Sequence, residues 1–194
     1  MIRQVENFMY LVSELFLAPT LILLVLLFVY SLYALGAFAW QTVQRNRQLQ
    51  TYADMMANRG ALPDPAALAG YPLASFFVAR SGDAARLTRD HLDIAALKEL
   101  EGVRTASRVA PMLGLIATMI PMGPALKSLG EGNVQGISEN LIVAFSAVIF
   151  GLVIASITFW IASVKKRWLA NELVDLTELL DADVGQTSGS GGET

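Results

Sequence analysis

The sequence predicts an all-α, polytopic membrane protein with three transmembrane helices. Residues 15–44, 109–125 and 140–164 contain no Asp, Glu, Lys, Arg or His. About 20 mostly apolar residues cross a hydrocarbon core of ~30 Å, so the first and third stretches are long enough and the second is near the lower limit. The composition agrees, because 54% of the 194 residues are hydrophobic, 16% are charged and the mean hydropathy is +0.50.

The basic residues predict the orientation of the chain. Most of the 14 lysines and arginines lie between the first two uncharged stretches, and three more follow the third at residues 165–167. Because loops rich in Lys and Arg face the cytoplasm, both segments are expected there. The N-terminus and the connection 127–139 are then outside, which gives an N-out, C-in topology. The basic residues between the first two stretches are Arg45, Arg47, Arg59, Arg80, Arg86, Arg89, Lys98, Arg104 and Arg108.

The N-terminal part of the chain is expected to contain two elements. Residues 1–15 place apolar side chains on one helical face, which predicts an external amphipathic helix on the membrane surface. Transmembrane helix 1 then covers residues 16–44, with Pro19 tolerated in its first turns. A signal-peptide cleavage site at residues 37–39 is disfavoured, because the apolar run is long, Glu6 and Glu14 precede it and arginines follow it. The residues on the amphipathic face are Val5, Phe8, Val12 and Leu15.

Residues 45–105 are predicted to form a cytoplasmic helical region. Helix-breaking residues gather at 58–65, and a second turn is indicated at 69–72. From Asp83, a plausible N-cap, the residues favour one helix that enters the membrane without interruption. His91 lies on this helix and is interpreted as a solvated side chain.

Residues 106–164 form the predicted channel core, with transmembrane helices 2 and 3. Span two carries three prolines and two glycines, which membranes tolerate when neighbouring groups satisfy the freed carbonyls, so we expect it to pack inside an assembly. A short glycine-rich turn leads to span three. There Gly151 and Ala155 form a small-xxx-small pair that allows close helix contact, which we expect to lie between subunits. The prolines and glycines of span two are Pro111, Gly114, Pro121, Gly123 and Pro124.

Helix 3 is expected to continue into the cytoplasm as an amphipathic helix over residues 165–184. Its leucines form one stripe, interpreted as a packing seam between subunits, and acidic residues are placed on the opposite face. Residues 185–194 are rich in Gly and Ser and are predicted to be disordered. The stripe consists of Leu169, Leu173, Leu176 and Leu180, and the acidic residues are Glu172, Asp175 and Glu178.

The sequence contains no nucleophile motif, phosphate-binding loop or metal-ligand cluster, so we expect neither enzymatic activity nor a cofactor. Cysteine is absent and histidine occurs once, which argues against a metal centre. No nucleic-acid partner is expected. The candidate polar groups inside the spans are the hydroxyls of Thr118, Ser146, Ser156 and Thr158.

These hydroxyls allow two interpretations. Each can bond the carbonyl three or four residues earlier in its own helix. Alternatively, Thr118 and Ser146 line a water-filled path and orient water or bond an acid. Because neither residue titrates, the carboxylate that carries the ion has to come from a partner.

The layout and two motifs resemble the MotA/TolQ/ExbB proton-channel family. Residues 109–118, Val-Ala-Pro-Met-Leu-Gly-Leu-Ile-Ala-Thr, look like the signature aPxxGLxGT at the start of span two. Residues 136–146, followed by Gly151 and Leu152, are similar to the signature GIaeaLiaT…GL that opens span three. The motifs cover residues 104–164, and the rest of the chain agrees in layout alone.

The sequence departs from the family pattern at several positions. Ala117 replaces a glycine, and the prolines at 121 and 124 are additional. Span three is longer before Gly151, so that either Ala144 or Val148 takes the place of the family threonine, with Ser146 the nearest hydroxyl.

The resemblance implies the pore-forming, stator-like subunit of an ion-driven motor in the cytoplasmic (inner) membrane. Such subunits form homopentamers in which spans two and three line a pore and span one faces lipid. A dimer of single-span ExbD/TolR/MotB-like partners inside the pore would supply one Asp per chain, and proton or sodium flow would energise work across the envelope. An uncoupled scaffold and a membrane component of a solute-uptake transporter are the alternatives.

The resemblance also suggests roles for individual residues. Thr118 and Ser146 are the candidates for the ion path. The motif positions expected to serve helix packing are Pro111, Gly114, Glu139 and Gly151.

Overall fold

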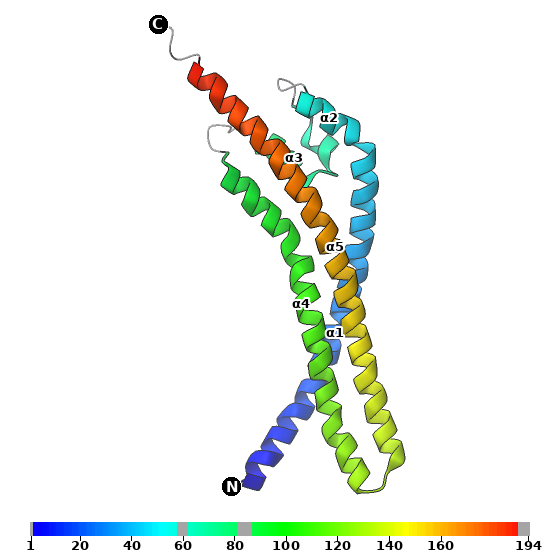
Figure 1. Cartoon of the computed structure of the whole chain (residues 1–194). Helices are drawn as coiled ribbons and strands as arrows, with labels where there is room; N and C mark the ends of the chain where they lie inside the picture. The colour runs from blue at the N-terminus through cyan, green and yellow to red at the C-terminus, as the bar shows by residue number, and fades with distance from the viewer. Residues whose placement is uncertain (1, 58–61, 81–86, 190–194) are drawn as a thin grey trace. The chain divides into compact units, whose positions relative to one another are not determined.

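A computed structural model describes residues 2–57, 62–80 and 87–189, and every regular element in these ranges is a helix (Figure 1). Among the described residues, three helices are long and apolar enough to cross a membrane. The predicted all-α class and three transmembrane helices are therefore confirmed, while the N-out orientation stays a prediction. The elements are α1 (Ile2–Arg47), α2 (Leu49–Ala57), the 3-10 helix η1 (Pro65–Leu68), α3 (Pro72–Arg80), α4 (Arg89–Gly130) and α5 (Val134–Gly189).

The chain divides into two compact units. Unit 1 consists of Met1–Leu35 and Val103–Trp160, and unit 2 consists of Gly36–Gly102 and Ile161–Thr194. The three long helices α1, α4 and α5 contribute residues to both units. Unit 1 contains most of the uncharged sequence, whereas unit 2 contains α2, η1 and α3.

Helix α1 is continuous from Ile2 to Arg47, so no helix boundary separates residues 1–15 from the first span. Pro19 lies inside this helix, and the N-terminal part of α1, blue in Figure 1, bends away from the line of the rest. A proline has no N–H to donate to the carbonyl four residues earlier, here Leu15, and its ring displaces that carbonyl. The predicted external helix is thus the first part of α1, and its place on the membrane surface stays a prediction.

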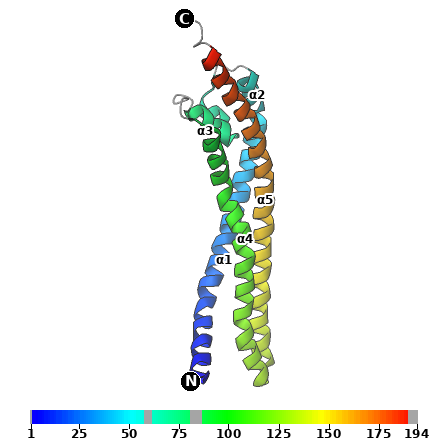
Figure 2. The same ribbon diagram turned by 60° about the vertical axis from the view of Figure 1, so that its left-hand side comes forward.

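In unit 1, α4 and α5 pack side by side through small residues (Figure 2). The buried cluster contains Leu24 of α1, Ala110 and Ala117 of α4, and Ala147 and Ile154 of α5. Lipid is as apolar as these side chains, so transmembrane helices gain stability from close backbone approach rather than from leaving water. Alanine and glycine permit that approach, which explains their place on the facing sides of the two helices.

The turn between α4 and α5 satisfies its own backbone groups. Gly132 adopts a φ of +73°, its N–H donates to Leu129 O at 3.1 Å, and Asn133 N–H donates to Ser128 O at 2.9 Å. These bonds form a Schellman motif, which needs a left-handed residue that glycine adopts without strain. Asn133 then caps α5, because its Oδ1 accepts from Gly136 N–H at 3.0 Å. The predicted turn is therefore present, although α4 extends through Gly130.

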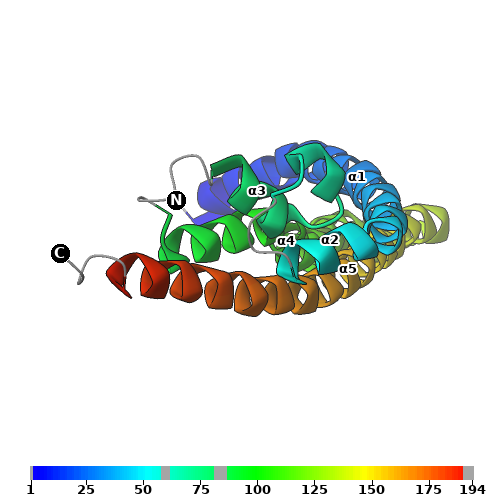
Figure 3. The ribbon, with the colours of Figure 1, turned by 90° about the horizontal axis from the view of Figure 1, so that it is seen from above.

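In unit 2, α2 and α3 lie beside α4 and α5 (Figure 3). Together with η1 these helices enclose a core of large apolar side chains. Leu169 and Leu176 are buried in this core, and Leu173 and Leu180 pack against it. The leucine stripe of residues 165–184 is thus filled by segments of the same chain, which corrects the expected seam between subunits. The buried members are Tyr52, Met55, Leu68, Tyr71, Leu73, Ala74, Val78, Leu92, Leu100, Leu169 and Leu176.

Helix α4 begins at Arg89, and Leu87 and Thr88 before it are not helical. The expected N-cap Asp83 and the breakers at 58–61 lie outside the described residues. Thr88 precedes the helix, and its N–H donates to Nδ1 of His91 at 3.3 Å while its Oγ1 lies 2.8 Å from the same atom. His91 therefore bonds back to the residue before its own helix, and both contacts lie at an exposed position.

Two other predicted boundaries can be compared with the structure. The turn predicted at 69–72 is found between η1 and α3. Helix α5 runs on to Gly189, so residues 185–189, which were expected to be disordered, are helical. Residues 190–194 lie outside the described part of the chain.

Candidate functional site

The two predicted ion-path hydroxyls bond within their own helices. Thr118 is half-buried on α4, and its Oγ1 donates to Leu115 O at 2.6 Å. Ser146 is exposed on α5, and its Oγ donates to Ile142 O at 2.7 Å. A hydroxyl has one hydrogen to donate, so neither residue also donates to the other in this conformation. Their oxygen lone pairs can still accept a hydrogen bond from water or a protonated acid.

Two further candidate hydroxyls, both in span three, behave in the same way. Ser156 is exposed and donates to Leu152 O at 2.8 Å, whereas Thr158 is fully buried and donates to Ile154 O at 2.7 Å. The first of the two interpretations, a hydroxyl satisfied by its own helix, therefore describes all four residues in the isolated chain. The four residues differ in exposure, and the buried Thr158 has no access to a pore.

The prolines of α4 free backbone carbonyls near Thr118. Pro121 and Pro124 lie inside the helix and have no N–H, so the carbonyls of Ala117 and Ile120 lack their usual donor four residues later. In a membrane such oxygens are satisfied by neighbouring side chains or ordered water. Span two thus adds acceptors to the Thr118 hydroxyl, and a cluster of acceptors can hold water or a protonated carboxyl group.

Charged residues flank the uncharged segments 109–125 and 140–164. Glu139 is exposed before span three and accepts from Gln135 Nε2 at 3.1 Å. After that span, Lys165 forms an ion pair with Glu99 of α4, with 2.7 Å between Nζ and Oε1. Moving protons through lipid requires a titratable group at depth. The two segments themselves contain none.

The two motif glycines touch each other across α4 and α5. A Cβ atom added to Gly151 would lie 2.8 Å from Ala110 O and 3.1 Å from Gly114 Cα, closer than real Cβ contacts. A Cβ added to Gly114 would lie 3.5 Å from Cα of Gly151 and of Val148. The close contact expected of Gly151 is therefore made within one chain, which corrects its assignment to a subunit interface. Pro111, half-buried, lies on the same stretch of α4.

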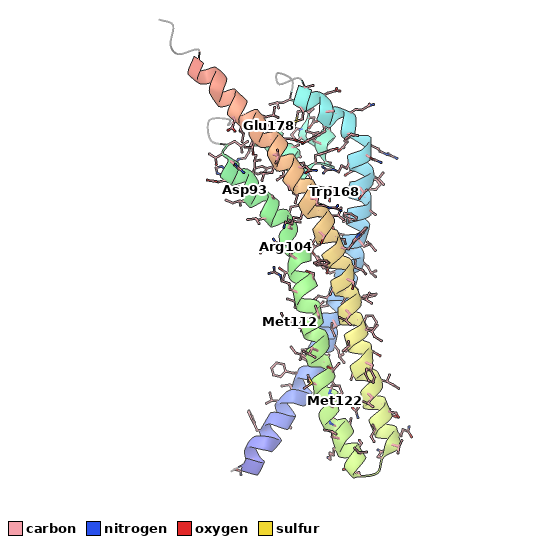
Figure 4. The ribbon with its side chains drawn as sticks, viewed as in Figure 1. Asp93, Arg104, Met112, Met122, Trp168 and Glu178 are labelled. Atoms are coloured by element: carbon pink, nitrogen blue, oxygen red, sulfur yellow. The ribbon has the colours of Figure 1, made fainter. Side chains whose placement is uncertain are left out.

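Beyond this contact, α4 and α5 leave apolar side chains uncovered in the isolated chain (Figure 4). On α4 the exposed residues recur at spacings of three and four, and they include Met119 at 69% and Leu115 at 64% exposure. Faces of this kind are covered by lipid or by another protein helix. The exposed residues of the α4 stripe are Met112, Leu115, Ile116, Met119, Met122 and Leu126.

Comparison with protein families identifies the family to which this chain belongs. A model described as the MotA/TolQ/ExbB proton channel family matches residues 79–178, just over half of the chain. The chain belongs to the MotA/TolQ/ExbB proton channel family. Searches of curated proteins and of solved structures found no match. The family match confirms the resemblance seen in the two motifs, and it covers α4 and most of α5.

Members of the MotA/TolQ/ExbB family are channel subunits that energise membrane complexes, so this chain is a multi-pass membrane protein of that kind. Family membership does not identify the partner or the process energised. Nor does it assign the hydroxyls at 118 and 146, which stay predictions.

Within the region that matches the family, sequence reasoning missed a buried carboxylate. Glu172 of α5 was placed on the solvent face, but its side chain is completely buried. Its Oε1 forms an ion pair with Arg45 Nη1, and its Oε2 accepts from Leu73 N–H at 3.1 Å. Burial raises the pKa of the Glu172 carboxyl, and the bonds from Arg45 and from the α3 backbone act in the opposite direction. The spacing could have predicted this burial. Glu172 lies three residues after Leu169 and four before Leu176, which places it on the same helical face as these buried leucines.

Aromatic rings surround Arg45 and continue the network. Its guanidinium carbon lies 4.2 Å from the ring centroid of Tyr71 and 5.0 Å from that of Trp168. Tyr71 stacks on Tyr52, and Trp168 stacks on Phe38. Tyr52 also donates its hydroxyl to Asp175 Oδ2 at 2.8 Å, and burial with this carboxylate raises the pKa of the phenol.

Proposed function

We propose that the chain is the pore-forming, stator-like subunit of a proton-driven motor in the cytoplasmic membrane. The observation that carries this proposal is the pairing of the family match with charge-free spans. A subunit whose membrane segments hold no titratable side chain can provide the walls of an ion path, but another chain has to provide the ion-binding group.

The proposed partner is a single-span membrane protein with one Asp in its span, present as a dimer inside a homopentamer of this chain. The uncovered stripe on α4 supports this arrangement, because Thr118 lies next to it with its oxygen available as an acceptor. The carbonyls freed by Pro121 and Pro124 lie within two turns of Thr118 and add acceptors for water. Spans two and three would line the pore, and span one would face lipid.

The physical basis of coupling is the charge of the partner carboxylate. An ionised Asp is held beside water that is bound to Thr118 and to the freed carbonyls, because moving it across apolar side chains such as Met119 is costly. Protonation removes that cost and lets the partner helix change position against α4 and α5. Deprotonation on the other side restores the charge and prevents return, so proton flow drives movement in one direction.

Proton flux into proteoliposomes tests this function. The chain alone should conduct no faster than empty vesicles, whereas the complex purified from its host with its small subunit should conduct. Replacing the membrane Asp of that subunit with Asn should abolish the flux, and native mass measurement should give five copies of this chain with two of the partner. Strong conduction by the chain alone would overturn the proposal.

The proposed N-out, C-in orientation is tested separately. A reporter fused after Gln50 or after Asp183 should lie in the cytoplasm, because basic residues flank both spans on that side. A reporter inserted at Gly132 should lie outside. A cytoplasmic signal at Gly132 would contradict the three-span arrangement.

An uncoupled scaffold is the second candidate, and one observation favours it. Val148 or Ala144 occupies the position of the family threonine, so in either register span three has no hydroxyl at that position. A purified complex that contains the partner but does not conduct would support the scaffold. A solute-uptake role would require a transported solute to co-purify or to depend on this chain.

A further inference from the structure

We propose that Arg45, Glu172 and the start of α3 form a latch that stays closed while the motor works. The latch holds the segments that follow spans one and three together with α3, so that these parts of unit 2 move as one rigid body. This inference rests on the proposed function, because it assigns the moving contacts of the cycle to other residues.

The first observation is that Glu172 bonds two segments far from it in the sequence. One carboxylate oxygen pairs with Arg45, 127 positions away at the end of α1, and the other accepts from the N–H of Leu73, 99 positions away at the start of α3. The first N–H groups of a helix have no partner within the helix. Glu172 therefore caps α3 and neutralises Arg45 at the same time.

The second observation is that neighbouring groups hold the Arg45 side chain in place. Its flat guanidinium lies against the rings of Tyr71 and Trp168, both within the range of cation–π attraction. The backbone of Gly70 lies so close that an added Cβ there would be 2.6 Å from the N atom of Arg45. A lysine could supply the charge but not the stacking.

The third observation concerns the surroundings of the latch. Tyr52 on α2 stacks on Tyr71 and bonds Asp175 of α5, and Phe38 of α1 stacks on Trp168. Opening the latch would leave the Glu172 carboxylate, the guanidinium and an α3 N–H buried without partners, which is far costlier than keeping them paired. A contact with that penalty is suited to hold position, not to open once in every cycle.

Hydrogen exchange of the full chain in nanodiscs tests whether the latch exists. Glutamine at 172 replaces one of the two carboxylate oxygens with an NH2 group that only donates, so it cannot accept from Arg45 at one atom and from Leu73 at the other. Glu172→Gln should therefore raise the exchange of α3 amides at least about tenfold. The matched control is Glu178→Gln, an exposed carboxylate on the same helix, which should leave α3 unchanged.

Equal exchange of α3 in the two variants would overturn the latch. If Glu172→Gln does not assemble, Arg45→Lys keeps the charge and removes the stacking, and it should still raise α3 exchange. Unchanged α3 exchange in Arg45→Lys would refute the part assigned to the rings.

A reversible crosslink tests whether the latch stays closed during the cycle. The chain has no cysteine, so Tyr52→Cys with Asp175→Cys creates the only two thiols, at side chains that touch in the structure. Bridging them with a short, cleavable bis-maleimide fixes α2 to α5 beside the latch. The crosslinked complex should conduct protons as fast as the same complex after cleavage.

The outcomes separate this inference from the proposed function. Flux that stops on crosslinking and returns on cleavage would show that these segments must part, and would overturn the closed latch. A complex that does not conduct before crosslinking refutes the proposed function, and hydrogen exchange then decides by itself whether the latch exists.

Discussion

Each of the two units is stabilised internally by a different kind of packing. In unit 1 the buried apolar cluster takes three alanines and one isoleucine from α4 and α5, and two glycines let the backbones touch. In unit 2 the core consists mostly of leucine, tyrosine and methionine. The difference follows from the solvent, because burying large apolar groups is rewarded in water, whereas in lipid only close packing is.

Polar groups are also treated differently in the two units. In unit 1 each hydroxyl discussed above bonds a carbonyl of its own helix, so these bonds do not hold helices together. In unit 2, Glu172 and Asp175 bond groups on other segments. The stability of unit 1 therefore depends on the close fit of its helices, and that of unit 2 depends on the burial of large apolar side chains and on paired polar groups.

The largest expected effect comes from Gly151→Leu. The new side chain would run into the Ala110 carbonyl, which is backbone and cannot move aside, so we expect a loss of about 5 kcal/mol and failure to fold. Gly36→Leu is the matched control, because nothing lies within 4 Å of a Cβ at that glycine. Thermal unfolding in detergent measures both. Similar stability of the two variants would contradict the close contact of α4 and α5.

The next effect is expected in the core of unit 2. Leu176→Ala removes a completely buried side chain and leaves a cavity, which should cost about 3 kcal/mol. Val174→Ala, two residues earlier on the same helix, removes an exposed side chain and should change stability by less than about 0.5 kcal/mol. If chemical denaturation found equal costs, the assignment of the leucine stripe to the core of the chain would be wrong.

Thr118→Val tests the ion path with little effect on folding. It removes the hydroxyl at nearly constant volume, so proton flux by the complex should fall about tenfold, equivalent to ~1.4 kcal/mol. Thr118→Ser keeps the hydroxyl and should retain most of the flux, while Ser156→Ala tests a hydroxyl outside the proposed path. Normal flux in Thr118→Val would remove this residue from the path.

The smallest effect is expected at the start of α4. Thr88→Ala removes the hydroxyl that contacts Nδ1 of His91 and should cost about 0.5 kcal/mol. Thr105→Ala, at an exposed position inside the same helix, should be neutral or slightly stabilising because alanine favours helices. Amide exchange in the first turn of α4 should rise in the first variant alone. A rise in both would place the effect elsewhere.

The sequence was sufficient for features that depend on local pattern. Uncharged stretches predicted α1, α4 and α5, because no other element satisfies its backbone within a single segment of lipid-embedded chain. Small residues predicted a close helix contact at Gly151. They did not reveal the identity of the neighbour, because a helical face looks the same whether α4 of the same chain or another subunit covers it.

The features that were missed depend on contacts far apart in the sequence. Glu172 was assigned to solvent because acidic residues recur along α5, yet α3 and the end of α1 cover it. Similarly, the leucine stripe gained partners from α2, η1 and α3, whose short helices carry little pattern by themselves. The contact of Thr88 with His91 is local and could have been found from the rule that the side chain of the third helical residue bonds back to the N–H of the residue before the helix.

The self-contained turn at Gly132 has a consequence for biosynthesis. Because Ser128, Leu129 and Asn133 satisfy the backbone of the turn, the hairpin of α4 and α5 needs no outside group to close. Helices adjacent in sequence also meet faster than distant ones. We therefore expect spans two and three to leave the insertion machinery as a preformed pair, with the turn crossing the bilayer already closed and its amide groups hidden from lipid.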